Sequence, residues 1–169
     1  WFPIPVHTAA TLWDRLDKSG VIGIKGVYVH GPANRLIGVI SLKQSYPGHA
    51  RQIASLAGAL LHGGACVGRY IITVDEDVDP SNLDEVLWAV ATRTNPQRDI
   101  SIVPGFLTSP LDPTVSPEDR ERKDFTTAKV FIDACWPYHL KDSIPRAIRA
   151  SDEIRNDVMT KWKELFENN

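Results

Sequence analysis

The sequence predicts an α/β domain of the α+β kind, a mixed β-sheet with helices packed on it. Two strand-like segments around a tight turn come early, and short β-branched segments then alternate with amphipathic helical ones. This alternation favours a sheet covered by helices, and the opening hairpin makes part of the sheet antiparallel. The 169 residues suffice for one domain with a proper core but not for two ordinary ones. We therefore expect a single domain over residues 1–169.

The first predicted elements are a short helix and a hairpin. Residues 1–7 form an apolar segment broken by prolines, which we interpret as a linker from a preceding domain. Thr8 is a suitable cap for the helix that follows, in which the apolar side chains share one face. The segments 21–30 and 36–42 predict antiparallel strands joined by the turn at 31–34.

The middle of the chain predicts two helices and a buried strand. After a break at 46–48, apolar residues recur at helical spacing, namely Ile53, Leu56, Ala57, Leu60 and Leu61. Residues 70–74 are a short β-branched run, which is typical of a strand covered on both faces. A second helical stripe follows, with Asp79 and Pro80 as its predicted start and Ser81 as an alternative cap. This stripe consists of Leu83, Val86, Leu87, Val90 and Ala91.

The last third predicts two short strands, 100–103 and 130–133, and a terminal helix. Between the strands, residues 104–117 contain four prolines, which regular structure does not tolerate, and residues 118–124 are all charged, as in a solvated loop. The helix over 151–169 begins at a serine cap and carries large apolar residues. Such a helix needs a partner surface, on this subunit or on another.

Composition narrows the function classes. A hydrophobic content of 43%, 24% charged residues and a net charge of −2 describe an ordinary globular chain with no electrostatic reason to bind nucleic acid or an anionic membrane. No apolar run approaches a membrane span. The two cysteines lie far apart without metal-ligand spacing, so we expect no disulfide framework and a cytoplasmic location. Because Trp1 is not a natural start of translation, we expect a piece of a longer protein.

The acidic turn after residue 74 has four possible interpretations. Asp75, Asp77 and Asp79 alternate as in a calcium loop, but the glycine and glutamate that such a loop needs are missing. The strand resembles the magnesium-binding strand of P-loop hydrolases, yet no G-x-x-x-x-G-K-[ST] motif precedes it. A metal-dependent nucleotide-sugar site on Asp75 and Asp77 stays open. Stabilisation of the following helix by an anionic first turn is the simpler interpretation.

Two further segments could meet a ligand. Lys43 leaves a predicted strand just before a glycine turn that opens a helix, so its ammonium and the helix amides could bind an anion together. A surface lysine is the alternative interpretation. The apolar, proline-stiffened stretch 104–113 could line a pocket or pack over the domain's own core.

Five blocks stand in a characteristic order along the chain. They are Lys43-Gln44-x-x-x-Gly48-His49-Ala50, Val74-Asp75-Glu76-Asp77-Val78-Asp79, Glu85-Val-Leu-Trp88-Ala89-Val-x-Thr92-Arg93, Asn95-Pro96-x-Arg98-Asp99 and Lys129-x-x-Ile132-Asp133-Ala134. In this order they resemble the C-terminal domain of the UbiD-type decarboxylases. The resemblance runs from about residue 20 to about 140.

The resemblance implies a reversible, non-oxidative carboxy-lyase that acts on aromatic, heteroaromatic or α,β-unsaturated carboxylic acids with prenylated FMN. Such enzymes hold the flavin, a divalent metal such as Mn, and K mainly through an N-terminal domain, which also carries the catalytic residues. No catalytic residue and no metal ligand is therefore expected in this chain. The isolated chain is expected to be inactive, and the partners implied are that flavin-binding domain, a second copy forming a homodimer or higher oligomer, and the acid substrate.

By the same resemblance, Lys43 contacts the flavin phosphate, and Phe106, Leu107 and Thr108 close over the substrate ring. Asp75, Asp77, Arg93, Arg98 and Asp99 become structural turn and ion-pair residues. The segment Cys135-Trp136-Pro137-Tyr138-His139 and the short 104–124 loop look more like the branch that acts on phenolic or heteroaromatic acids. Two alternatives remain, an assembly module without turnover of its own and the nucleotide-sugar domain described above.

Overall fold

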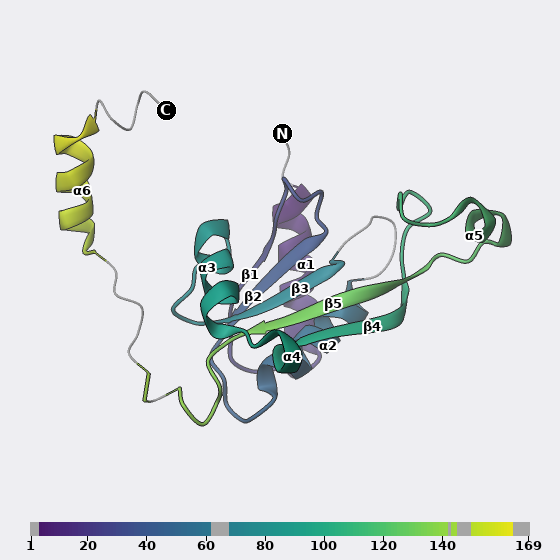
Figure 1. Ribbon diagram of the computed structural model, residues 1–169, viewed down its shortest axis with the longest axis horizontal. Coiled ribbons are helices and arrows are strands. Elements are labelled where there is room, and N and C mark those ends of the chain that lie inside the picture. Colours follow the sequence, from purple (N-terminus) through teal and green to yellow (C-terminus); the bar gives the residue numbers. More distant parts are fainter. Residues whose placement is uncertain (1–3, 62–67, 142, 145–149, 164–169) are drawn as a thin grey trace.

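The computed structural model describes residues 4–61, 68–141, 143–144 and 150–163, which form a five-stranded mixed sheet flanked by helices (Figure 1). The strands are β1 (Ile24–Val29), β2 (Ile37–Leu42), β3 (Tyr70–Asp75), β4 (Ile100–Leu107) and β5 (Thr126–Ala134). The helices are α1 (Ile4–Lys18), α2 (His49–Leu60), α3 (Leu83–Arg93), α4 (Pro96–Asp99), α5 (Pro117–Arg122) and α6 (Asp152–Lys161). The predicted fold class is confirmed.

The sheet has the strand order β1-β2-β3-β5-β4. β1 and β2 form the predicted antiparallel hairpin, β2, β3 and β5 run parallel, and β4 lies antiparallel at the far edge. The three parallel strands therefore end at the same edge of the sheet. That edge receives the loop before α2, the acidic turn before α3 and the chain that leaves β5.

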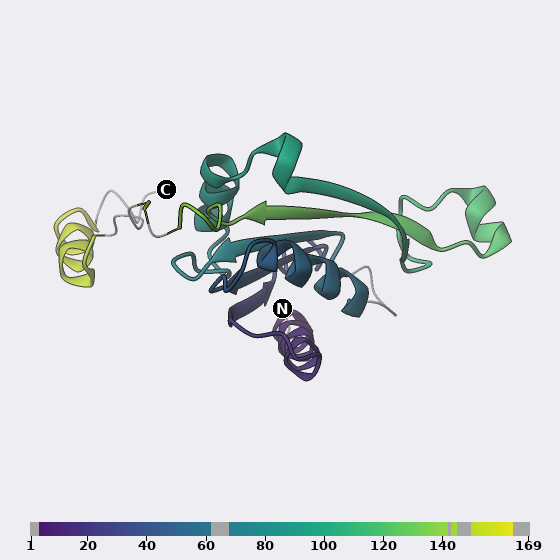
Figure 2. The same cartoon turned by 90° about the horizontal axis from the view of Figure 1, so that it is seen from below.

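Each face of the sheet has its own apolar core. α1 and α2 cover one face (Figure 2), and the buried residues there include Leu12, Leu16, Ile40, Leu42, Ile53, Ile71 and Phe131. α3 covers part of the other face, with Val39, Ile72, Val74, Val86 and Ala89 buried beneath it. Full burial of such a side chain contributes about 1.5–3 kcal/mol. The predicted stripe of α2 is confirmed, but that of α3 is wrong in part. α3 contacts the sheet with the side that carries Val86, Ala89 and Arg93, so Leu83 and Leu87 are exposed.

Two predicted helix starts are wrong. α1 begins at Ile4, so residues 4–7 are helical rather than a linker, because Pro5 falls in the first turn, where a missing N–H costs no helical hydrogen bond. α3 is capped by Asn82, whose side chain accepts from the backbone N–H groups of Asp84 and Glu85. Asp79 instead accepts from the N–H and hydroxyl of Ser81 in the preceding turn.

The β4–β5 region is more regular than predicted. β4 continues through Pro104 because it is an edge strand, and the register shifts between Val103 and Phe106, where Gly105 has a φ of +85°. The charged run forms the short helix α5, capped by Ser116, rather than a loop. The predicted strand 130–133 is the end of a longer β5. Together β4 and β5 form a hairpin that projects from the sheet with α5 at its tip (Figure 1).

α6 lies apart from the sheet in both views (Figures 1 and 2). Ser151 caps it as predicted, accepting from the N–H of Ile154 at 3.3 Å. The outer parts of the predicted linker and terminal helix, residues 1–3 and 164–169, lie outside the described residues, as does Cys66. Cys135 is a buried free thiol. None of the helices within the described ranges is long and apolar enough to cross a membrane.

Candidate functional site

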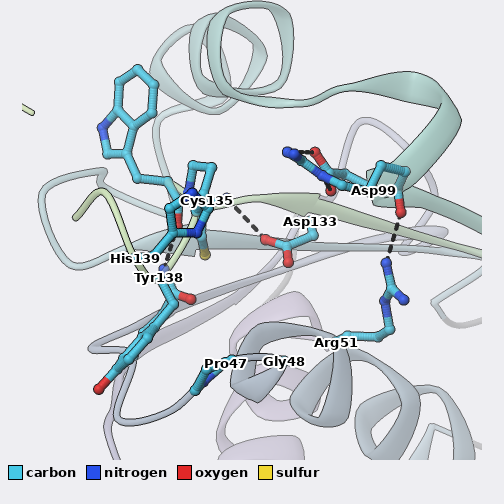
Figure 3. A pocket seen from close by; sticks show the side chains of 12 residues that line it. Pro47, Gly48, Arg51, Asp99, Asp133, Cys135, Tyr138 and His139 are labelled. Atoms are coloured by element: carbon cyan, nitrogen blue, oxygen red, sulfur yellow. Dashed lines mark hydrogen bonds and ion pairs between the residues drawn. The ribbon is translucent and has the colours of Figure 1, made fainter.

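The common carboxyl edge of β2, β3 and β5 borders a pocket of about 390 Å³ (Figure 3). Ligands of α/β sheets bind in crevices at this edge. The walls come from the loop after β2 and the first turn of α2, from α4, and from the end of β5 with the chain that follows it.

Asp75 connects the ends of the three parallel strands. Its Oδ1 accepts from Gln44 Nε2 at 3.0 Å, and its Oδ2 accepts from the backbone N of Trp136 at 2.7 Å. Gln44 Nε2 also donates to the Trp136 carbonyl at 2.8 Å, which closes a ring of hydrogen bonds that we call the Gln44–Asp75–Trp136 ring. Burial raises the pKa of Asp75, an effect that Trp136, Gln44 and Arg93 oppose. The ring fixes three segments that are distant in sequence.

Arg93, the last residue of α3, supplies the positive charge beside this ring. It is 4% exposed, donates to both carboxylate oxygens of Asp77 at 2.9 and 2.8 Å, and reaches Asp75 Oδ2 at 3.2 Å. Its guanidinium lies 5.0 Å from the Trp88 ring centroid and 5.1 Å from that of Trp136. Burial alone would lower the pKa of Arg93, but the hydrogen bonds and charges of Asp77 and Asp75 outweigh it and raise the pKa.

This arrangement confirms that Asp75, Asp77 and Arg93 are ion-pair residues. A metal on the two carboxylates would have to displace a buried guanidinium and leave it without counter-charge, which is costly. No cluster of three or more potential metal ligands occurs among the residues that the structure describes. The nucleotide-sugar alternative therefore loses the geometry that it needs.

The residues that line the pocket carry further charges. Arg98 pairs with Asp99 at 2.7 Å, as predicted, and Arg51 of α2 donates to the Arg98 carbonyl at 2.7 Å. Asp133 accepts from the backbone N of Cys135 at 3.0 Å, and burial raises the pKa of Asp133 (Figure 3). Neither Arg51 nor Asp133 was predicted from the sequence to have a role at the site. Their positions in the first turn of α2 and at the end of a buried strand are the signal that could have found them.

Lys43 directly follows β2 and has a fixed backbone with an exposed side chain. Its N–H donates to the Gly23 carbonyl at 2.8 Å. A Cβ on Gly23 would lie 2.6 Å from the Lys43 carbonyl oxygen, and Gly23 has a φ of +81°, so this approach needs glycine. Lys43 is not among the residues that line the pocket, although its neighbour Gln44 is.

The next two residues are held by the chain that leaves β5. Lys141 Nζ donates to the carbonyl of Gln44 at 3.2 Å, and the Tyr138 hydroxyl donates to the carbonyl of Ser45 at 2.9 Å. The N–H of Ser45 donates to Nδ1 of the buried His49 at 3.1 Å. Each residue of the loop 43–45 is thus anchored to another part of the fold.

Phe106, Leu107 and Thr108 lie at the other end of the sheet. Phe106 pairs with Thr127 at the start of β5, whereas the Lys43 loop is level with its end. The seven residue steps from Thr127 to Ala134 separate the two by about 23 Å at about 3.3 Å per step. Within one chain the structure does not bring these predicted site residues together.

Each of the three has a distinct environment. Phe106 packs edge-to-face on Phe131 and beneath the buried ammonium of Lys129. The side chain of Leu107 is 57% exposed. The Thr108 hydroxyl donates to Asp112 at 2.7 Å. Phe106 thus packs on the domain's own core, as one of the two interpretations expected, whereas Leu107 faces outward and its contact with a substrate stays a prediction.

Asp112 organises the loop between β4 and β5. It is fully buried, pairs with Arg69, and accepts from the hydroxyls of Thr108 and Thr114, while Arg120 donates to its carbonyl. Burial alone would raise the pKa of Asp112, but the hydrogen bonds from Arg69, Thr108 and Thr114 hold that pKa well below its usual range. No role was predicted for Asp112 from the sequence, because its partners lie on separate segments.

The fold and the anchored edge define an α+β domain that presents a pocket and an exposed lysine at the carboxyl ends of its parallel strands. Residues 4–134 match the family described as 3-octaprenyl-4-hydroxybenzoate carboxy-lyase C-terminal domain. The chain belongs to this family, the C-terminal domain of the UbiD-type decarboxylases, which confirms the resemblance found in the sequence.

Known proteins agree with this assignment. The phenolic acid decarboxylase of Bacillus subtilis (strain 168) is 34% identical over 140 residues, covering 80% of this chain and 27% of that protein. The apo 3,4-dihydroxybenzoic acid decarboxylase of Enterobacter cloacae superposes with a TM-score of 0.70 at 28% identity, covering 85% of this chain and 30% of that one. The UbiD-class enzyme HmfF from Pelotomaculum thermopropionicum, solved in complex with FMN, gives 0.69 at 27% identity with the same coverage. The chain spans less than a third of each of these relatives.

Proposed function

We propose that this chain is the C-terminal, cofactor-contacting and dimer-forming part of a reversible, non-oxidative decarboxylase of aromatic acids, with phenolic acids as the first substrates to test. Relatives named phenolic acid decarboxylase and 3,4-dihydroxybenzoic acid decarboxylase support this class of substrate. When bound, prenylated FMN supplies the electron sink for loss of CO2. The catalytic groups, the divalent metal and potassium are expected on the preceding domain.

The observation that carries the proposal is the placement of Lys43. Its ammonium is exposed on an anchored loop at the edge of the sheet where ligands bind. The N-terminus of α2 follows five residues later and has no side-chain cap at Gly48, so its amides can also face an anion. A flavin phosphate fits this combination of charge and donors, and FMN in the related HmfF structure supports a flavin ligand.

The proposal is tested in the parent protein. Reconstitution with prenylated FMN should give CO2 release from phenolic acids, and inactivity across a broad panel of aromatic acids would contradict it. Lys43→Ala should weaken flavin retention about 10- to 150-fold, because one charge-assisted phosphate contact of about 1.5–3 kcal/mol is lost. Lys18→Ala removes an exposed charge on α1 and serves as the matched control. Equal cofactor occupancy in the two variants would refute the role of Lys43.

A second function, assembly, rests on α6. Ile154, Val158 and Met159 are exposed on a helix that lies apart from the sheet, and so is Trp162, its C-cap (Figure 1). Apolar side chains at this spacing form a stripe that needs a partner. We propose that this stripe docks on a second copy in the homodimer. Light scattering of the parent protein with and without residues 151–169 tests this, and an unchanged mass would contradict it.

A further inference from the structure

We propose that Gln44 is a positioning residue, which holds Lys43 in place for a phosphate through the Gln44–Asp75–Trp136 ring. The inference rests on the proposed function, because it concerns how the Lys43 ammonium is presented. Gln44 is adjacent to Lys43 and only 7% exposed, and its two amide protons face two acceptors, Asp75 Oδ1 at 3.0 Å and the Trp136 carbonyl at 2.8 Å. A buried amide satisfied in this way has one conformation.

The ring is itself fixed from outside. Trp136 donates its backbone N–H to Asp75 Oδ2 at 2.7 Å, and Arg93 binds the same oxygen at 3.2 Å. The end of β2 therefore cannot shift without breaking bonds to the ends of β3 and β5. Because Lys43 is one residue from Gln44, its Cα is fixed by the same bonds.

The other contacts of the loop point to the same role. The Lys43 N–H is bound by Gly23 on one side, and the Ser45 carbonyl is bound by Tyr138 on the other. A long lysine side chain loses considerable conformational entropy when it binds. Fixing its backbone beforehand leaves only the side chain to be ordered, which strengthens the contact with a phosphate.

The test uses the full-length parent protein with two probes, FMN and riboflavin, which differ by the phosphate. Gln44→Met keeps an unbranched side chain of similar length but removes both donors. It should weaken FMN binding by about 3- to 10-fold, the effect of one or two hydrogen bonds, and leave riboflavin binding unchanged. Gln97→Met, a substitution at an exposed position on α4, is the matched control and should change neither.

Epistasis with Lys43 distinguishes positioning from general structural damage. If Gln44 acts through the lysine, Gln44→Met should cost no further FMN affinity in a Lys43→Ala background. An equal loss in both backgrounds, or an equal loss for riboflavin, would overturn the inference. Tyr138→Phe removes only the hydroxyl hydrogen bond to Ser45, and it should lower FMN affinity by a smaller factor without changing riboflavin binding. This variant tests the positioning of Lys43 even if Gln44→Met does not fold.

The outcome also separates this inference from the proposed function. If Lys43→Ala leaves FMN affinity unchanged, the phosphate contact is wrong, and Gln44 has nothing to position. If Lys43→Ala weakens FMN binding while Gln44→Met and Tyr138→Phe do not, the phosphate contact stands and only the positioning role is refuted.

Discussion

Replacing Arg93 by methionine should destabilise the domain by about 3–5 kcal/mol, the cost of removing one partner from a buried ion pair. The change removes two hydrogen bonds to Asp77 and one to Asp75, and leaves two carboxylates that are only 21% and 17% exposed without their counter-charge. It also removes a cation that lies near two indole rings, those of Trp88 and Trp136.

The assay is urea unfolding of the chain, monitored by tryptophan fluorescence. The loss should shrink as the pH falls, because without Arg93 the folded-state pKa of Asp75, already raised by burial, rises further. When a carboxyl group has a higher pKa in the folded than in the unfolded protein, the free energy of unfolding increases as the pH drops through the folded-state pKa. The variant should therefore recover part of its deficit in acid.

Two further variants test whether the loss comes from the buried ion pair. Adding Asp77→Asn to Arg93→Met should reduce the loss, since a neutral amide no longer needs the guanidinium. Arg122→Met breaks an exposed pair with Asp119 and should cost far less. A small loss for Arg93→Met, or strict additivity with Asp77→Asn, would show that the buried ion pair does not stabilise this edge of the sheet.

Two other predictions concern buried or strained positions. Burial lowers the pKa of Lys129 from 10.5 to about 8, so the unfolded chain binds more protons between these values, and the free energy of unfolding should rise with pH there by up to about 1.4 kcal/mol per unit. Lys129→Met should abolish that slope, and parallel curves of unfolding free energy against pH for the two proteins would contradict it. Gly23→Ala should destabilise more than Gly20→Ala in the same urea assay, because both have a positive φ but only Gly23 would also place a Cβ 2.6 Å from the Lys43 carbonyl. Equal losses would mean that the loop gives way to the new methyl group.

The sequence predicted those parts of the fold that depend on local periodicity. The hairpin, β3 and the helical stripe of α2 follow from residue spacing over one element, and the structure confirms them. The stripe of α3 was wrong in part, because Ala89 rather than Leu83 or Leu87 is buried with Val86. The predicted start of α3 failed because Asp79, Ser81 and Asn82 are all good caps, and tertiary packing decides among them. The extent of β4 failed because a proline is tolerated where the strand has a free edge.

The candidate site was less predictable because its contacts join distant segments. Gln44 and Trp136 are 92 positions apart, so no local pattern could reveal their bond. The separation of Lys43 from Phe106 depends on β4 running antiparallel to β5, which sends the two segments to opposite ends of the sheet. A structural role for Asp77 and Arg93 could be suggested from the resemblance, since both residues lie in the blocks that carry it.

The Asp112 loop has a consequence for how this domain tolerates change. Most hydrogen bonds of Asp112 join residues within the loop itself. Among the described residues, its one ion pair is with Arg69, which links the loop to the rest of the fold. Changes in the length or surface of this loop should therefore leave the sheet and its covering helices undisturbed, because the hairpin that carries the loop projects away from them (Figure 1).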